Sequence, residues 1–226
     1  MKPDYSEEEL LEAKRQIDSI LHKLRETVCT LCEKENAERL KSQITLAERR
    51  IQALEIADAL IGKAMGWRIW RLAEHPEMAE EAATWLSSKW DIPVEAYRES
   101  IQESARVGAA VPQWYIVRAG DAASARIIAG CGIIENDFHD RPDLAPNLCA
   151  LYVEEEHRHR GLARHLLDHA RTGVSAMGHS RLYLVTDLAG FYEKCGWEYV
   201  GEVNELNGGS IRLYGADALP HCKQGK

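Results

Sequence analysis

The stretch "LYVEEEHRHRGLARHLL", residues 151–167, decides the fold of this chain. It starts as an apolar strand, turns at Arg158–Gly161 and continues as a helix in which Leu162, Leu166 and Leu167 share one face. A helix entered directly from a strand leaves the N–H groups of its first turn without intrahelical partners. We therefore expect an anion-binding helix N-terminus at this turn.

The side chains of the turn favour a phosphate ligand. Gly161 lets the backbone come close to a ligand, and the small Ala163 leaves that approach open. Arg158 and Arg160 add positive charge at the same point. The neighbouring histidines have neither HExxH spacing nor a third ligand, so we expect no metal site. The formal net charge of −8 argues against a nucleic-acid binder, which leaves a diphosphate as the expected ligand.

Strands and helices alternate on both sides of this stretch, from Trp67 to the C-terminus. Strands are expected at residues 67–72, 113–120, 125–137, 147–153, 181–187, 197–203 and 209–216. Helices are expected at Glu77–Lys89, Glu95–Arg106 and 188–195, besides the helix after Gly161. "GDAAS" and "NELNGG" are expected to turn two hairpins. This order predicts an α/β (α+β) fold built on a mixed sheet.

The first 65 residues have a helical periodicity instead. Ser6 and Glu9 form a capping box, and Asn36 is expected to cap a second helix that ends near Gly62. The two expected apolar stripes are Leu10, Ala13, Ile17, Ile20, Leu24, Val28 and Leu31, and Leu40, Ile44, Ala47, Ile51, Leu54 and Ile61. We therefore expect an antiparallel helical hairpin at 1–65, followed by a domain at 66–226. Because a two-helix hairpin buries little surface alone, we expect it to serve packing, homodimerisation or regulation.

Composition narrows the protein class further. Hydrophobic residues make up 45% of the chain and charged residues 28%, and no run approaches the roughly 20 apolar residues needed to cross a bilayer. The N-terminus lacks the pattern of a signal peptide, so we expect a cytoplasmic protein without membrane contact. Cys29 and Cys32 form a CxxC pair, but structural zinc needs four ligands. Because the six cysteines are scattered and no signal peptide is expected, we expect reduced thiols rather than disulfides.

Two motifs give a specific family resemblance. "RHRGLA", Arg158–Ala163, fits the pattern [RQ]-x-x-G-x-[GA], and "GFYEKCGWE" places Gly196 and Trp197 after Tyr192. With the order of elements, they make residues 67–218 resemble the GNAT N-acetyltransferase superfamily. The resemblance implies a mixed, mostly antiparallel sheet flanked by helices, with acetyl-CoA as co-substrate and no metal. The helical hairpin lies outside it.

The resemblance also implies where acetyl-CoA would bind. Strands 147–153 and 181–187 would splay apart, and the backbone of the first would pair with the pantetheine arm. The backbone N–H groups of the turn would hold the pyrophosphate, and an N–H near Leu151 would polarise the thioester carbonyl. The implied cofactor-binding residues are Leu151, Tyr152, Val153, Arg158, His159, Arg160, Gly161, Leu162, Ala163 and Arg164.

Tyr192 would be the general acid that protonates the departing thiolate. Many family members carry an asparagine seven residues before this tyrosine, where this chain has Val185. The general base stays open between Asp187, Asp140 and a chain of waters. Trp90, Asp140 and Asp187 are the candidate acceptor contacts, because an aromatic wall and negative charge suit a cationic amine.

The resemblance implies an N-acetyltransferase that moves an acetyl group directly from acetyl-CoA to a primary amine of a small molecule or a protein. The alternative is a non-catalytic sensor or assembly protein that binds CoA or acetyl-CoA and acts through its N-terminal hairpin. The presence of Arg158, Gly161, Ala163 and Tyr192 together favours the enzyme.

Overall fold

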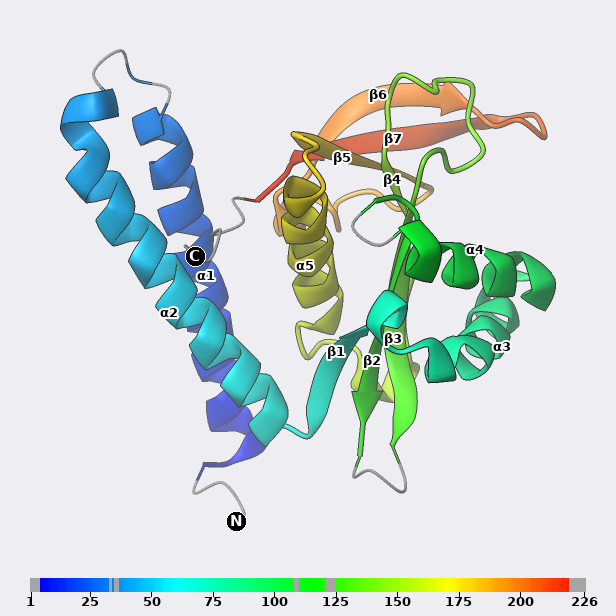
Figure 1. The fold of residues 1–226 in the computed structure, drawn as a ribbon, viewed down its shortest axis with the longest axis horizontal. Coiled ribbons are helices and arrows are strands. Elements are labelled where there is room, and N and C mark those ends of the chain that lie inside the picture. Colours follow the sequence, from blue (N-terminus) through cyan, green and yellow to red (C-terminus); the bar gives the residue numbers. More distant parts are fainter. Residues whose placement is uncertain (1–4, 33, 35–36, 108–109, 121–124, 220–226) are drawn as a thin grey trace. The chain divides into compact units, whose positions relative to one another are not determined.

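The computed structural model describes residues 5–32, 34, 37–107, 110–120 and 125–219 (Figure 1). The chain divides into two compact units, with the boundary between Arg68 and Ile69. The first unit is a pair of long helices, and the second contains nearly all of a seven-stranded sheet with its covering helices. Among the described residues, no helix combines the length and apolar character that a membrane span requires.

The first unit is an antiparallel pair of helices, α1, Glu7–Cys32, and α2, Lys41–Ala64. The predicted capping box is confirmed at its start. The N–H of Glu9 donates to Ser6 Oγ at 3.3 Å, and the N–H of Ser6 donates to Glu9 Oε2 at 2.8 Å. Asn36, the predicted cap of the second helix, lies outside the described residues.

The contact between the two helices differs from the predicted stripe. Ala13 and Ile20 are exposed, and the neighbouring Lys14 and Leu21 are buried in their place. The buried face of α1 steps by four and three residues alternately, which is the 3.5-residue repeat of two helices packed along their length. Lys14 enters this face because its ammonium pairs with the carboxylate of Asp58, which is also buried.

The second unit confirms a mixed, mostly antiparallel sheet, in the order β1-β2-β3-β4-β5-β7-β6. Its strands are β1 Trp67–Arg71, β2 Gln113–Ala119, β3 Arg126–Ile134, β4 Asn147–Val153, β5 Arg181–Thr186, β6 Glu198–Asn204 and β7 Ser210–Asp217. The pairs β2–β3, β3–β4, β5–β7 and β6–β7 are antiparallel, and β4–β5 is parallel. Most of the predicted turn "GDAAS" lies outside the described residues.

Helices cover both faces of strands β2 to β4 (Figure 1). α3, Ala79–Trp90, and α4, Val94–Val107, lie on one side, and α5, Leu162–Ala176, lies on the other. Alternate residues of β2 serve the two faces. Trp114 and Ile116 belong to the core under α3 and α4, whereas the ring of Tyr115 packs against His169 of α5.

The short segments between these elements contain 3-10 turns. They lie at Ala37–Leu40, Leu72–Glu74, Pro76–Met78, Glu155–His157 and Glu193–Cys195. The helix predicted over 188–195 is therefore wrong, since only its last turn is helical. Gly190 adopts a positive φ of 79°, and a left-handed residue interrupts a right-handed helix, whereas Gly196, at 81°, caps the last turn.

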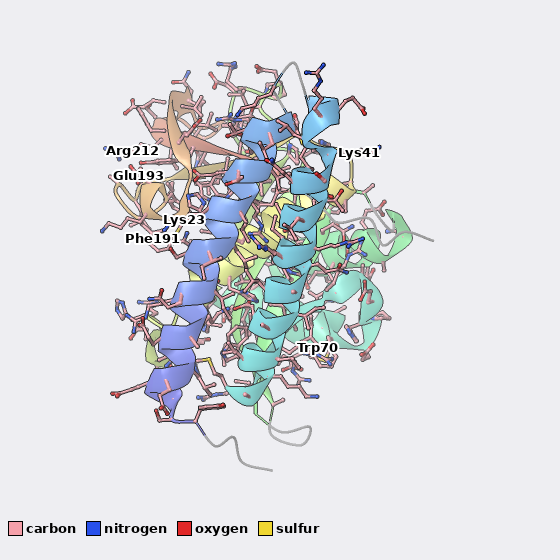
Figure 2. The ribbon with its side chains drawn as sticks, turned by 90° about the vertical axis from the view of Figure 1, so that its left-hand side faces the viewer. Lys23, Lys41, Trp70, Phe191, Glu193 and Arg212 are labelled. Atoms are coloured by element: carbon pink, nitrogen blue, oxygen red, sulfur yellow. The ribbon has the colours of Figure 1, made fainter. Side chains whose placement is uncertain are left out.

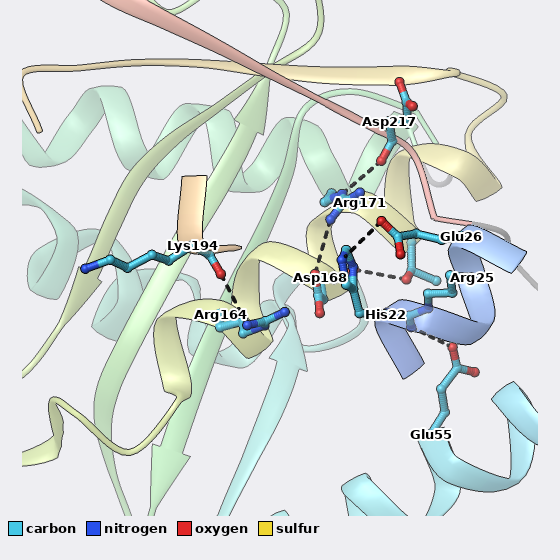
Figure 3. Close-up of polar contacts among 10 residues, drawn as sticks. His22, Arg25, Glu26, Glu55, Arg164, Asp168, Arg171, Lys194 and Asp217 are labelled. Carbon is cyan, nitrogen blue, oxygen red and sulfur yellow. Dashed lines mark hydrogen bonds and ion pairs between the residues drawn. The ribbon is translucent and has the colours of Figure 1, made fainter. Parts of the chain in front are cut away.

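α5 is anchored to the end of the sheet by one buried arginine, shown in Figure 3. Arg171 Nε donates to the carbonyl of Asp217 at 2.8 Å, and its Nη1 lies 3.5 Å from Asp168 Oδ1. The carbonyl of Arg171 in turn accepts the N–H of Leu219 at 3.2 Å. These bonds hold α5 against β7, so that the position of its N-terminal turn relative to the sheet is set.

Candidate active site

β4 contains a bulge in its second half. Gly130 of β3 pairs with Tyr152, and Gly132 pairs with Cys149, so Ala150 and Leu151 together stand opposite a single residue. Ala150 has a φ of 52°, in the left-handed region. A bulge takes a residue out of the ladder and turns its peptide groups away from the neighbouring strand. The bulge falls where the resemblance placed the polarising N–H, beside Leu151.

β4 and β5 form a fork. Their single register pair is Asn147 with Tyr183, and the N–H of Tyr183 also donates to the carbonyl of Pro146 at 3.0 Å. Both strands are fully described, and within these residues they share no second pair, although β4 continues to Val153. The strands therefore part toward their carboxyl ends. Facing strand edges with unpaired peptide groups can accept an extended, amide-bearing chain between them.

The N-terminus of α5 follows the open end of this fork. Gly161 is the N-cap with a φ of 78°, and the first helical hydrogen bond joins the N–H of His165 to the carbonyl of Gly161 at 3.0 Å. The N–H groups of Leu162, Ala163 and Arg164 precede that bond, so they point out of the helix end. A Cβ built on Gly161 would meet no atom within 4 Å, so the space in front of the turn is open.

Two arginines of the predicted set have structural bonds of their own. Arg158 Nε donates to the carbonyl of Val153 at 3.0 Å, which ties the turn to the end of β4. Its guanidinium also lies over the ring of Tyr152, 5.6 Å from the centroid. Arg164 Nη1 donates to the carbonyl of Lys194 at 3.3 Å, as Figure 3 shows. Arg164 therefore links the first turn of α5 to the segment that carries Tyr192.

Tyr152 lies in an aromatic and basic cluster that the sequence did not reveal. Its ring centroid is 6.2 Å from that of Trp90 and 5.9 Å from that of Trp85. Lys89 Nζ lies 5.0 Å from the same ring and pairs with Glu154 at 2.6 Å. Although burial opposes it, hydrogen bonds from Lys89 and Trp85 hold the pKa of Glu154 below its usual value. Trp90 is thus placed beside the end of β4, with 43% of its surface exposed.

Tyr192 is buried, with 7% of its surface exposed, near the end of β5. Its ring packs against Phe191 at 5.0 Å and Tyr214 at 5.8 Å between centroids. Burial raises the pKa of Tyr192 to about 12, against the opposing effect of a side-chain hydrogen bond with Thr186. The phenol therefore keeps its proton at neutral pH, which is the state that a proton donor needs.

The segment after β5 is bonded to β7. Arg212 Nη1 donates to the carbonyl of Asp187 at 3.3 Å, and the hydroxyl of Tyr214 donates to Glu193 Oε1 at 2.8 Å. Figure 2 labels Phe191, Glu193 and Arg212 on the same side of the view. These bonds place Asp187 at the end of β5, with its side chain exposed.

Asp140 lies in the loop between β3 and β4 and is engaged with β6. Its two carboxylate oxygens accept the N–H of Asn204 at 3.1 Å and the Nδ2 of Asn204 at 2.7 Å. These hydrogen bonds hold its pKa below the usual value.

Asp137, in the same loop, is a candidate base that the sequence did not identify. The carboxyl group of Asp137 is largely withdrawn from water, and this burial, followed by the charge of Glu205, raises its pKa to about 6.

A cavity lies apart from the fork, and two buried thiols lie in β3 and β4. A cavity of about 310 Å³ opens between β1, β2 and α5, with Arg71, Tyr115 and His169 in its wall. The thiols of Cys131 and Cys149 are buried, and burial raises the pKa of both. Neither thiol is therefore a nucleophile at neutral pH. Among the residues that the structure describes, no group of three or more His, Cys, Asp or Glu side chains could hold a metal ion.

One family profile matches the part of the chain that contains this site. Residues 113–199 match the family profile described as an acetyltransferase (GNAT) domain. No curated protein matches the chain significantly. The profile spans β2 to the start of β6, and thus contains the bulge, the fork, the turn before α5 and Tyr192.

Several solved structures are similar at low identity. An aminoglycoside 6'-N-acetyltransferase complexed with coenzyme A is 18% identical, over 69% of this chain and 99% of that chain, with a TM-score of 0.49. An aminoglycoside 6'-acetyltransferase type Ii is 21% identical, over 68% and 99%, with a TM-score of 0.49. A spermidine N-acetyltransferase variant from Vibrio cholerae is 14% identical, over 68% and 95%, with a TM-score of 0.48. The forked part of the sheet and the turn before α5 thus lie within the segment that matches the acetyltransferase (GNAT) domain profile.

Proposed function

We propose that the protein transfers an acetyl group from acetyl-CoA to a primary amine. The observation that carries the proposal is the fork, whose strands join only at Asn147 and Tyr183 and whose open end leads to the N-terminus of α5. The helix N-terminus at the open end of the fork suits a diphosphate, and the facing edges of β4 and β5 suit an extended chain of amides. Tyr192 lies beside β5, one of these two strands.

The residues present fit acetyl-CoA. The open space in front of Gly161 and the first-turn N–H groups from Leu162 to Arg164 would hold the pyrophosphate. Arg158, fixed to the end of β4, adds positive charge at the turn. Peptide groups on the β5-facing edge of β4, from Leu151 to Val153, would pair with the pantetheine arm.

When bound, acetyl-CoA supplies an activated thioester, and the protein positions it. An N–H at the bulge near Leu151 would donate to the thioester carbonyl and stabilise the negative charge that grows on its oxygen. Tyr192, protonated at neutral pH, would donate a proton to the departing thiolate. Direct attack by the amine needs no acyl-enzyme, in line with the buried, protonated thiols of Cys131 and Cys149.

The acceptor would reach the thioester from the side of the loops. Trp90, half exposed beside Tyr152, offers an aromatic surface at one side. Asp187 at the end of β5 and Asp140 in the β3–β4 loop add negative charge that favours a cationic amine. Because Asp140 is bound to Asn204, its contribution is that charge and the position of the loop.

Release of free CoA thiol tests the function. The full chain is incubated with acetyl-CoA and, separately, with butylamine, phenethylamine, spermidine and a peptide that contains one lysine. The proposal expects thiol release that depends on one of these amines, together with saturable binding of acetyl-CoA in calorimetry. Tight acetyl-CoA binding without turnover on any amine would instead support the non-catalytic sensor.

We further propose that the helical hairpin is a dimerisation arm. Four large apolar side chains of α1 and α2 are exposed, at 46% to 61% of their surface: Ile20, Leu46, Ile56 and Leu60. Ile56 and Leu60 are four residues apart on α2 and therefore neighbours on its surface, and exposed apolar neighbours favour contact with a partner. Light scattering should give the mass of a dimer for the full chain and of a monomer for the Ile56→Glu, Leu60→Glu variant. A monomeric wild-type chain would contradict this role.

A further inference from the structure

The loop between β3 and β4 is bonded to the hairpin of β6 and β7. The N–H of Leu206 donates to the carbonyl of Phe138 at 2.9 Å, and the N–H of Asp140 donates to the carbonyl of Asn204 at 3.0 Å. The carboxylate of Asp140 accepts two further hydrogen bonds from Asn204. These bonds fix the loop, and with it the backbone of the residue before Phe138, which is Asp137.

Asp137 is held at the closed end of the fork. Its N–H donates to Asn147 Oδ1 at 3.3 Å, and Asn147 is the residue that pairs with Tyr183 where β4 and β5 meet. His139 Nδ1 accepts the N–H of Arg141 at 3.2 Å, so its Nε2 carries the proton and donates to the same Asn147 oxygen at 2.6 Å. The pyrophosphate seat lies at the opposite, open end of the same fork.

The charge of the Asp137 carboxylate is felt by side chains of β4 and of the segment after β5. After burial, its charge contributes to the raised pKa of Cys149 on β4 and of Tyr192. Its own pKa is raised to about 6 by burial and then by Glu205. The titratable groups coupled to it from the elements around it are Glu205, Cys149, Tyr97 and Tyr192. A carboxyl group with this pKa is ionised at neutral pH yet still binds a proton readily.

The other carboxylates in the loops are engaged elsewhere. Asp140 is bonded to Asn204, and Asp143 accepts Arg141 Nε and Nη2 at 2.8 and 2.6 Å. These bonds lower the pKa of both groups, which makes them weaker bases. Burial instead raises the pKa of Asp137, in the same loop.

We propose that Asp137 is the general base that deprotonates the acceptor ammonium, at the closed end of the fork between the β3–β4 loop and the β6–β7 hairpin. This role rests on the acetyltransferase function proposed above. Asp137 takes one proton from the ammonium, and the neutral amine attacks the carbonyl carbon. A C–N bond forms, the C–S bond breaks, and the sulfur leaves with the electron pair. Tyr192 gives the sulfur its proton and recovers one from the new amide nitrogen.

Two exposed apolar side chains beside Asp137 indicate which amines fit. Phe138 directly follows it, and Leu206 is bonded to Phe138 through the backbone; 63% and 68% of their surfaces are exposed. A charged seat next to apolar surface suits a primary amine on a hydrocarbon chain, because the ammonium reaches the carboxylate while the chain covers the apolar side chains. Phenethylamine and butylamine are therefore the preferred probes.

The test compares the full-length Asp137→Asn, Asp137→Glu and Asp143→Asn variants across a range of pH. With phenethylamine, Asp137→Asn should lose about 10²-fold in kcat while acetyl-CoA affinity stays at the wild-type level. Its profile should also lose the inflection that the wild type shows near the pKa of about 6. Asp137→Glu should recover part of the rate, and Asp143→Asn, a carboxylate of the same loop, should match the wild type.

Hydroxylamine, which is already neutral at neutral pH, separates a base from a structural residue. Asp137→Asn should use it nearly as well as the wild type does, because this acceptor has no proton to lose before attack. An equal loss with both acceptors, or an unchanged pH profile with phenethylamine, would overturn the assignment of Asp137. A wild-type chain that acetylates none of the amines would overturn the proposed function itself.

Discussion

Replacing Gly161 by glutamate tests the pyrophosphate seat with a magnitude that follows from the structure. A side chain at this position enters open space, since a Cβ meets no atom within 4 Å, so the variant should fold. Its φ of 78° costs a non-glycine residue about 1–2 kcal/mol. A carboxylate held about 4 Å from one phosphate charge adds about 4 kcal/mol of repulsion at an effective dielectric of about 20.

The matched control is Gly161→Gln, which has the same shape and the same backbone strain but no charge. Glutamate should weaken CoA binding by about 10³-fold more than glutamine does, from the repulsion alone. Calorimetry with CoA measures the two affinities, and thermal unfolding followed by circular dichroism checks that both variants fold. Equal affinities for the glutamate and glutamine variants would refute the placement of the diphosphate at the N-terminus of α5.

Three further predictions concern single side chains. Tyr192→Phe should lower turnover by about 10²-fold at unchanged acetyl-CoA affinity in the thiol-release assay, and unchanged turnover would remove it from the mechanism. Asp137→Asn should stabilise the fold at alkaline pH by at most roughly 3 kcal/mol, because the pKa of Asp137 lies about 2 units above the ordinary 3.8. In the wild-type protein, the buried carboxyl group favours the folded state only while it is protonated, so the free energy of unfolding falls as pH rises through about 6. The gain should vanish below the ordinary pKa in urea titrations. Lys14→Met should cost about 3–5 kcal/mol by removing the cation that pairs with the buried carboxylate of Asp58, and adding Asp58→Leu should recover most of it.

The strand-turn-helix around Gly161 could be predicted because its signals are local. An apolar strand, a glycine in the turn and a leucine face in the helix each act within a few residues. The prediction of a helix at 188–195 was wrong because it relied on local composition alone. The composition of this segment suits a helix, but the backbone at Gly190 is left-handed, and the helical pattern of the sequence does not reveal that conformation.

The hairpin contact shows where periodicity reaches its limit. Steps of three and four residues fit both the predicted face with Ala13 and Ile20 and the observed face with Lys14 and Leu21. Hydrophobicity favoured the first choice. The structure has the second face because Asp58 of α2 pairs with Lys14 and compensates the cost of burying its charge. The periodicity of one helix cannot predict an ion pair with the other helix.

The candidate base could not be predicted because its environment comes from distant residues. Asp137 sits in a loop with several other aspartates, and nothing in the sequence separates it from Asp140 or Asp143. Its burial and the nearness of Glu205 arise only when the β3–β4 loop is bonded to the β6–β7 hairpin. The bulge of β4 likewise depends on how many residues β3 offers opposite it.

The central claim is that this chain moves an acetyl group from acetyl-CoA directly to an amine. The most direct measurement is the quantity of N-acetylated phenethylamine, determined by mass spectrometry, for each CoA thiol released by the full-length protein. The account predicts one acetylated amine per thiol and no acetylated protein at any time. Thiol release without acetylated amine, or transfer through an acetylated side chain of the protein, would contradict it.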